Sequence, residues 1–247
     1  MPKAYQSVFF DADDTLFDYP GAERAALLAC LEEFRIPLEP ESFIAAYRRH
    51  NHDVWREFER GETDQSTLRV ERFRRLAAEL VLPALPLERI SAFYLEALAG
   101  QPQLLPGALD LVRGLAKKFP LALITNGIAS VQKKRFAASP LSAYFQSIVI
   151  SEEVGVAKPD PRIFRPALEK LGLDAADVLY VGDSVTSDMA AARTPAWTSA
   201  GSTHRAPPSP RGKPPGSSRA NSGRSTRWRP ARNLTRRKTC TPSKNVP

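Results

Sequence analysis

The chain has 247 residues, of which 43% are hydrophobic and 9% aromatic, as in a globular protein with one large or two small domains. Its two cysteines, Cys30 and Cys240, are too few for a disulfide framework or a cysteine metal cluster. No apolar run approaches the length of a membrane span, and the first residues lack the apolar core of a signal peptide. The sequence therefore predicts a cytoplasmic protein with no membrane partner.

The net charge of +8 is unevenly distributed along the chain. Residues 1–193 carry 23 Lys and Arg against 27 Asp and Glu, a net charge of −4. Residues 194–247 carry 12 Lys and Arg with no acid, nine prolines and almost no aliphatic side chain. Such a segment cannot bury enough apolar surface to offset the entropy of ordering it, so we predict a disordered basic tail over residues 194–247.

The first predicted strand, residues 8–10, is apolar and is followed at once by Asp11, Asp13 and Asp14. Carboxylates at the tip of a buried strand are unfavourable unless a cation or ligand meets them, and ligands bind at the carboxyl ends of strands in open α/β sheets. One of Asp11 and Asp13 could act as nucleophile and Mg²⁺ ligand, and the other as general acid and base. An Asp-rich turn or helix N-cap explains the same residues equally well.

Helical periodicity dominates from residue 21 to residue 100, and Pro37, Pro40, Gly61 and a proline-rich segment at 83–86 divide it into four predicted helices. From residue 105 the pattern alternates between helices and apolar strands. The strands are predicted at 121–124, 147–150 and 178–181, and helices at 107–115, 130–138 and 162–171. This alternation predicts an α/β fold with a doubly wound parallel sheet, into which a helical lid is inserted after the first strand.

Polar residues follow three of the later elements. Thr125 and Asn126 end the second strand, and Lys158 precedes a proline ahead of a helix. Asp183 and Asp188 follow the last strand and could complete an oxygen-ligand set for Mg²⁺. Taken singly, the first fragment is better explained by a turn and the second by a surface lysine, and either Asp could be an N-cap.

Taken in order, Asp-x-Asp-x-Thr, Thr-Asn, Lys-Pro and Gly-Asp-x4-Asp resemble the motifs of the haloacid-dehalogenase-like superfamily of aspartate-based phosphohydrolases, over residues 5 to about 193. The inserted helices match that superfamily's α-helical cap. The sequences around Asp11, Thr125 and Lys158, with an acid at Asp14 where most relatives carry Gly, are similar to the pyrimidine 5′-nucleotidase branch. The resemblance implies a catalytic core at 1–18 and 104–193, with a cap at 19–103.

The resemblance also implies roles for the site residues. Asp11 would attack phosphorus and form an aspartyl-phosphate, and Asp13 would protonate the leaving oxygen and then activate water. Thr125, Asn126 and Lys158 would hold the phosphoryl group. Asp11, the backbone carbonyl of Asp13 and Asp183 would bind Mg²⁺, with Asp188 supporting that set.

We therefore expect a Mg²⁺-dependent phosphomonoesterase that hydrolyses nucleoside 5′-monophosphates, above all those of pyrimidines, as a monomer or weak dimer. A phosphatase of another small phosphometabolite is the alternative within the family. The other alternative is a nucleic-acid-binding or regulatory protein that uses the basic tail, although nucleic acid is the less favoured partner. Trp55, Phe58 and Phe73 are expected in the core of the cap rather than as a platform for a base.

After Arg193 the chain departs from the superfamily pattern, which continues with Asn-Ala-Gly and a strand containing Trp and Asn. If the codons are read one base earlier, the junction of Trp197 and Thr198 gives Asp, and the neighbouring triplets permit those residues. This indicates a frameshift near Arg193. The sheet would then lose the strand beside the one that carries Asp183 and expose an unpaired edge.

Restoring the reading frame is expected to yield an additional strand and helix, and to raise the melting temperature of a protein that otherwise aggregates. Sequencing the gene and comparing thermal unfolding of the two products tests this. A restored frame that meets an early stop codon or encodes no apolar strand would show that the tail is genuine.

Overall fold

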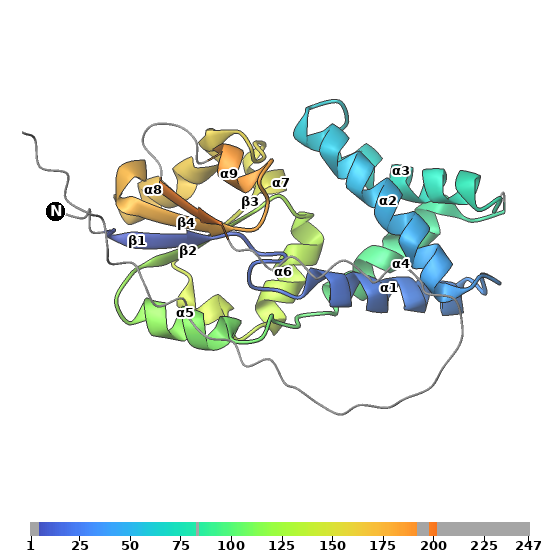
Figure 1. Cartoon of the computed structure of the whole chain (residues 1–247), viewed down its shortest axis with the longest axis horizontal. Coiled ribbons are helices and arrows are strands. Elements are labelled where there is room, and N and C mark those ends of the chain that lie inside the picture. The colour runs from blue at the N-terminus through green and yellow to red at the C-terminus, as the bar shows by residue number, and fades with distance from the viewer. Residues whose placement is uncertain (1–4, 83, 192–197, 202–247) are drawn as a thin grey trace, which may run out of the picture. The chain divides into compact units, whose positions relative to one another are not determined.

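The computed structural model describes residues 5–82, 84–191 and 198–201, all of which belong to one compact unit, Met1–Arg205. Five parallel strands form one sheet in the order β3-β2-β1-β4-β5 (Figure 1). These are β1 (Ser7–Phe10), β2 (Leu121–Thr125), β3 (Ser147–Ile150), β4 (Val178–Gly182) and β5 (Thr198–Gly201). In the centre, Phe10 pairs with Leu123 of β2 and Val181 of β4, so both neighbours end within two residues of the end of β1.

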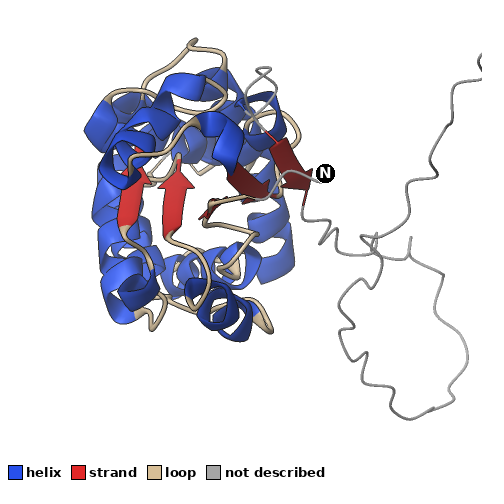
Figure 2. Cartoon of the chain, turned by 90° about the vertical axis from the view of Figure 1, so that its left-hand side faces the viewer, coloured by secondary structure: helices blue, strands red, loops and turns tan. Residues whose placement is uncertain are grey.

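Helices cover both faces of the sheet (Figure 2). They are α5 (Ala108–Ala116), α6 (Ala129–Ala138), α7 (Ser151–Val154), α8 (Arg165–Leu171) and α9 (Asp188–Ala191). Val8 and Phe10 belong to the core on the α5 side, whereas Phe9 belongs to the core on the α8 side. Because successive strand residues face opposite layers, every residue of β1 is apolar or small and buried. This confirms the doubly wound parallel sheet.

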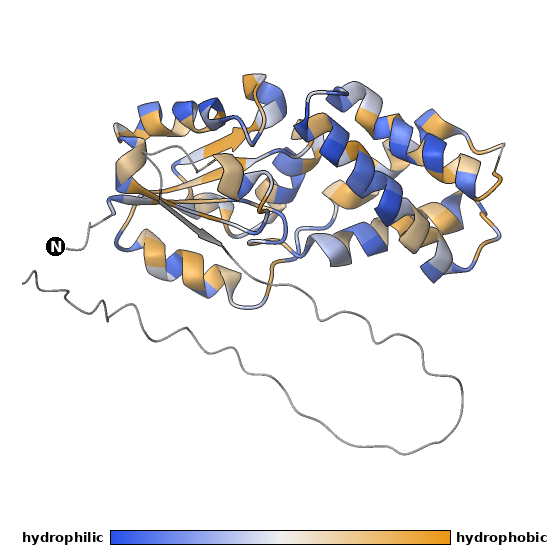
Figure 3. Ribbon diagram, turned by 45° about the horizontal axis from the view of Figure 1, so that its top comes forward, coloured by the Kyte–Doolittle hydropathy of each residue, from blue (hydrophilic) through white to orange (hydrophobic). Residues whose placement is uncertain are grey.

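Four helices are inserted between β1 and α5, as predicted. They are α1 (Tyr19–Glu33), α2 (Pro40–Glu59), α3 (Gln65–Glu79) and α4 (Leu87–Ala99). Hydrophobic and hydrophilic residues alternate along them, and their apolar residues form a cluster of their own (Figure 3). The rings of Tyr47, Phe73 and Tyr94 meet at its centre, with centroids 5.1–5.5 Å apart. None of the described helices is long and apolar enough to cross a membrane.

The two linkers of this bundle run side by side. Leu105 N–H donates to the Leu16 carbonyl at 2.9 Å, and Asp18 N–H donates to the Gln103 carbonyl at 3.0 Å. The chain thus enters and leaves the cap at one place, a few residues beyond Asp11. Ile128 and Val131, at the start of α6, pack into the cap cluster and hold the bundle over the carboxyl end of the sheet.

The predicted tail is partly ordered, which corrects the sequence analysis. Residues 198–201 form β5, which pairs in parallel with β4 from Leu179↔Thr198 to Gly182↔Gly201. The prediction of an unpaired edge beside β4 is therefore wrong. Unpaired backbone groups at a sheet edge can pair with an extended segment that is not apolar, so apolar character alone does not predict this strand. The remaining predicted disorder, at 194–197 and 202–247, lies outside the described residues, and the frameshift stays a prediction.

Replacing Phe73 with alanine should lower the free energy of unfolding by about 3–5 kcal/mol, because its fully buried ring fills the centre of the cap cluster. Urea unfolding measures the change. Leu28→Ala on α1 is the control, since Leu28 is 37% exposed, and should cost less than about 1 kcal/mol. Equal losses in the two variants would show that the rings of the cap do not stabilise the fold.

Candidate active site

Three strands deliver polar side chains to one edge of the sheet. Asp11 follows β1, Thr125 ends β2, and Asp183 follows β4. Asp11 N–H still donates to the Val181 carbonyl, at 2.8 Å, so the backbone of Asp11 is fixed to the end of β4 as well. The predicted site residues of these strands therefore lie together, beneath the helical bundle.

Lys158 is the buried centre of the site, with 2% of its surface exposed. Its ammonium donates to Asp11 Oδ1 at 2.5 Å, to Asp188 Oδ1 at 2.7 Å and to the Tyr180 hydroxyl at 3.2 Å. Burial alone would lower the pKa of Lys158, but Asp11, Tyr180 and Asp188 raise it well above its ordinary value. The lysine is therefore charged and opposes the negative charge of the candidate nucleophile.

Asn126 holds this lysine by its backbone. The Asn126 side-chain amide donates to the Lys158 carbonyl, and its oxygen accepts from Lys158 N–H, both at 2.8 Å. Both ends of the amide are thus engaged. The predicted phosphate-binding residue Asn126 uses its side chain to position Lys158, which ties the loop before α8 to the end of β2.

Carboxylate oxygens of Asp11, Asp183 and Asp188 lie within 4.8 Å of one another. Asp188 already accepts hydrogen bonds from Lys158, from the Tyr180 hydroxyl at 2.7 Å and from Ser184 N–H at 3.0 Å. A side chain on residue 182 would collide with Asp188, which explains the glycine there. Asp188 is therefore held in place by protein donors, whereas Asp183 is exposed to the pocket.

The charges of this cluster fit a divalent cation. Three carboxylates against one ammonium leave two negative charges, and hard divalent ions such as Mg²⁺ prefer carboxylate oxygens. Burial raises the pKa of Asp11 well above its ordinary value; Lys158 opposes this, while Asp188 and Asp183 add to it. Burial and Asp188 likewise raise the pKa of Asp183. An added cation would relieve this repulsion, so the residues present fit the metal.

Asp13 turns away from Lys158 toward α6. Its carboxylate accepts from Arg135 Nη1 at 2.5 Å and from Gln132 Nε2 at 2.7 Å. Gln132 also donates to the Thr125 hydroxyl at 3.1 Å, and a side chain on residue 127 would collide with it. Sequence reasoning missed Gln132 and Arg135, although their spacing of three on one helix, just after Thr125, was the available signal.

Asp14 has a left-handed backbone, with φ of 59°. Glycine adopts this region without strain, and Asp is among the few other residues that tolerate it. This gives a physical reason why the position can hold either an acid, as here, or the glycine expected in most relatives. Burial, with the charges of Asp183 and Asp13, raises the pKa of Asp14 to about 7. Its carboxyl lines the same pocket as Asp11.

This catalytic pocket has a volume of about 260 Å³ and lies between the core and the cap. The core supplies Asp11, Asp13, Asp14, Asn126, Gly127, Lys158, Asp183, Ser184, Ser187 and Asp188, and the cap supplies Tyr19, Asn51, Trp55 and Glu59. Thr125 itself is buried behind it, at 2% exposure. Sequence reasoning could not identify the cap residues, because helical periodicity alone does not say which polar face looks toward the sheet.

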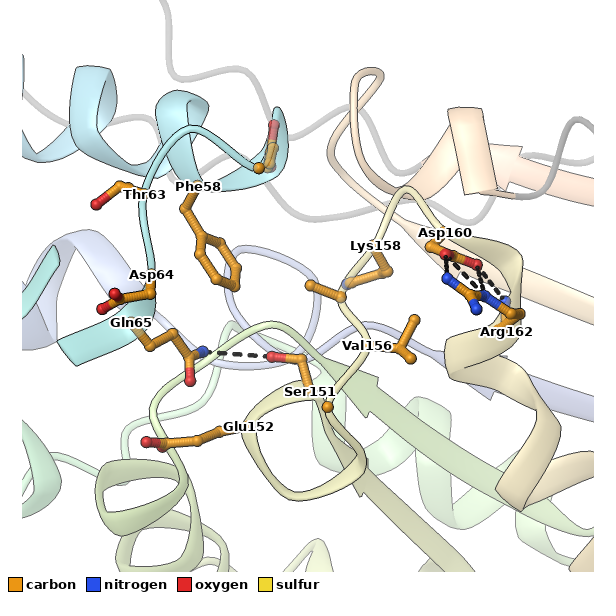
Figure 4. Close-up of a pocket in the computed structure, with 14 residues that line it drawn as sticks. Phe58, Thr63, Asp64, Gln65, Ser151, Glu152, Val156, Lys158, Asp160 and Arg162 are labelled. Carbon is orange, nitrogen blue, oxygen red and sulfur yellow. Dashed lines mark hydrogen bonds and ion pairs between the residues drawn. The ribbon is translucent and has the colours of Figure 1, made fainter. Parts of the chain in front are cut away.

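A second pocket, of about 470 Å³, adjoins the first beside Lys158 (Figure 4). Phe58 points into it from the cap, and Gln65 donates to Ser151 Oγ at 3.4 Å across it. Of the three aromatic residues expected in the core of the cap, Phe73 alone belongs to it. The same expectation is wrong for Trp55 and Phe58, which are half-buried and line the pockets.

The chain is similar to several known proteins. The chain is 34% identical to the Bacillus subtilis protein YfnB over 188 residues, 76% of this chain and 79% of that one. It is 35% identical over 187 residues to the pyrimidine 5′-nucleotidase YjjG of Escherichia coli, covering 74% and 79%, and 32% identical over 195 residues to the pyrimidine 5′-nucleotidase PynA of Streptococcus pneumoniae, covering 75% and 78%. The crystal structure of YfnB bound to magnesium superposes with a TM-score of 0.71, covering 75% of this chain and 83% of that one.

The family model of haloacid dehalogenase-like hydrolases matches residues 5–194. The match includes every predicted site residue and ends where the composition changes, at the start of the basic tail. The chain therefore belongs to the haloacid dehalogenase-like hydrolases, and it is a phosphoric monoester hydrolase.

Proposed function

We propose that the protein hydrolyses nucleoside 5′-monophosphates, above all those of pyrimidines, with Mg²⁺ and through an aspartyl-phosphate on Asp11. The observation that carries this proposal is the arrangement of Lys158, Asp183 and Asp188 around Asp11, in a chain about one third identical to two pyrimidine 5′-nucleotidases. The volume of the catalytic pocket, about 260 Å³, is sufficient for a small phosphate ester.

In the first step, a carboxylate oxygen of Asp11 forms a bond to phosphorus while the bond from phosphorus to the ester oxygen breaks. Asp13 gives a proton to that leaving oxygen. In the second step, Asp13 takes a proton from water, whose oxygen attacks phosphorus, and the bond to Asp11 breaks to release phosphate. Gln132 and Arg135 keep the Asp13 carboxylate on the side of the pocket where the leaving group departs.

Phosphoryl transfer depends mainly on positioning and on neutralising charge. Lys158 neutralises part of the charge shared by Asp11 and the phosphoryl oxygens, and the backbone at Asn126 and Gly127 lines the pocket where those oxygens lie. Asp11, Asp183 and the Asp13 carbonyl would hold Mg²⁺, which supplies the remaining positive charge.

The presence of Asp13 disfavours dehalogenation, the reaction for which the family is named. A halide leaves without a proton, so a second carboxylate at the leaving-group side would have no task. Here that carboxylate is held by two buried donors, which favours an ester oxygen as the leaving group.

A panel of phosphate esters tests the proposal directly. Phosphate release from UMP, CMP, AMP and phenyl phosphate should be fastest for the pyrimidine nucleotides and should stop when EDTA removes Mg²⁺.

Asp11→Asn should lower the rate at least about 1,000-fold, because an amide does not attack phosphorus. Asp110→Asn is the control, since Asp110 lies exposed on α5, and should leave the rate unchanged. Near-normal activity in Asp11→Asn would refute the covalent mechanism.

The role of Asp13 predicts a dependence on the leaving group. Asp13→Asn should slow UMP hydrolysis about 100- to 10,000-fold, the range of general acid–base catalysis, because the nucleoside oxygen needs a proton. Aspartyl-phosphate formation from p-nitrophenyl phosphate should be affected far less, since nitrophenolate leaves unprotonated. Single-turnover release of the two leaving groups measures this. Equal losses for both esters would show that Asp13 is not the acid.

A further inference from the structure

Arg72, on α3, is an unusual residue for the core of the cap. It is 1% exposed, and its guanidinium lies over the Tyr94 ring at 4.8 Å. Nη1 donates to Asn51 Oδ1 at 3.1 Å and Nε donates to the Arg69 carbonyl at 3.3 Å, but no carboxylate of the described residues lies within ion-pair distance of Arg72. Glu23, which is nearby, is paired with Arg48 at 2.6 Å. A buried charge is costly without a partner, so Arg72 needs a further acceptor.

A small inner cavity supplies a place for that acceptor. It has a volume of about 30 Å³ and shares Asp13, Tyr19, Trp55 and Gly127 with the catalytic pocket, so it continues that pocket into the cap. Arg72 and Arg135 both line it. In each of these two side chains Nη2 is buried and has no hydrogen-bond partner among the described residues.

The position of Asp13 shows which way the leaving group extends. The ester oxygen of the leaving group must lie within hydrogen-bond distance of the Asp13 carboxylate if Asp13 is to protonate it. Asp13 lines the inner cavity as well as the catalytic pocket. The larger pocket beside Lys158 shares only Glu59 and Lys158 with the catalytic pocket, and Asp13 does not line it. A leaving group that touches Asp13 is therefore directed toward Arg72.

We propose that Arg72 is a specificity-determining residue, whose free N–H groups bind an acceptor oxygen on the leaving group. A guanidinium has only donors, so the ligand atom must be an acceptor. A volume of about 30 Å³ admits one or two atoms the size of a water oxygen but no ring. The carbonyl oxygen of a pyrimidine meets both conditions, with the ring itself in the catalytic pocket beside Trp55. The inference rests on the proposed function and deepens it.

Arg135 differs from Arg72 in this respect, because its Nη1 is paired with the Asp13 carboxylate. In both arginines Nε donates to a backbone carbonyl, that of Gln101 for Arg135 and that of Arg69 for Arg72. The charge of Arg135 is compensated by an ion pair with Asp13, whereas Arg72 makes no ion pair among the described residues. The inner cavity therefore favours an acceptor with partial negative charge at the Arg72 end.

Substituting Arg72 tests the inference. Arg72→Met removes the donors and keeps an unbranched side chain among the rings, and it should lower kcat/KM for UMP about 10- to 100-fold, the effect of one hydrogen bond to a charged group. Phenyl phosphate, whose leaving group has no acceptor besides the ester oxygen, should change less than about threefold. Arg75→Met is the matched control: Arg75, on the same helix, pairs with Glu57 and Glu71 at 2.7 Å, and both esters should keep their rates.

The two esters separate the possible outcomes. Equal losses for UMP and phenyl phosphate, or unchanged discrimination between them in Arg72→Met, would overturn the assignment of Arg72. A wild type that prefers another ester over nucleotides would instead overturn the proposed function, and that ester then replaces UMP in the same comparison. If Arg72→Met does not fold, Arg72→Lys, which keeps the charge but replaces the three nitrogens of the guanidinium with one, is judged by the same criteria.

Discussion

The buried ammonium of Lys158 is the interaction on which the rest of the site depends. It contacts Asp11 from β1 and both Asp188 and Tyr180 from the β4 side, while Asn126 fixes its backbone from the end of β2. Three parallel strands are thus joined at one point. Without this charge the carboxylates would repel one another in a buried setting and their pKa values would rise further. With it, the remaining negative charge faces the pocket, where a divalent cation would balance it.

The cap completes the pocket from above and is stabilised separately. Its paired linkers and the contacts of α6 place it over the carboxyl end of the sheet, yet its own aromatic cluster holds its helices together. In the proposed reaction the core would therefore surround the phosphorus, whereas Tyr19, Asn51 and Trp55 of the cap would surround the rest of the ester. This division means that the chemistry and the choice of substrate depend on different residues, and that substitutions in the cap can alter one with little effect on the other.

Much of the fold and of the site could be predicted from the sequence. An apolar run predicts a buried strand, and acids directly after it predict a site for a cation or a ligand. The order of Asp11, Thr125, Lys158 and Asp183 along the chain was sufficient to predict the family, and the family model confirms that prediction. Residues whose importance arises only from packing could not be found: Gln132 and Arg135 look like an ordinary helix face, and Arg72 like a solvated charge. The strand β5 was missed for a related reason, since its pairing with β4 depends on backbone groups and not on side-chain pattern.

Trapping the phosphoryl group on the protein tests the central claim most directly. In Asp13→Asn, an ester with a good leaving group should still phosphorylate the enzyme, while the loss of the base slows hydrolysis of the intermediate. Acid quenching after a single turnover, proteolysis and mass spectrometry should then find the phosphoryl group on the peptide that contains Asp11, in a form that hydroxylamine removes. A stoichiometric release of the leaving group with the phosphoryl group on another residue, or with none bound to the protein, would contradict the account.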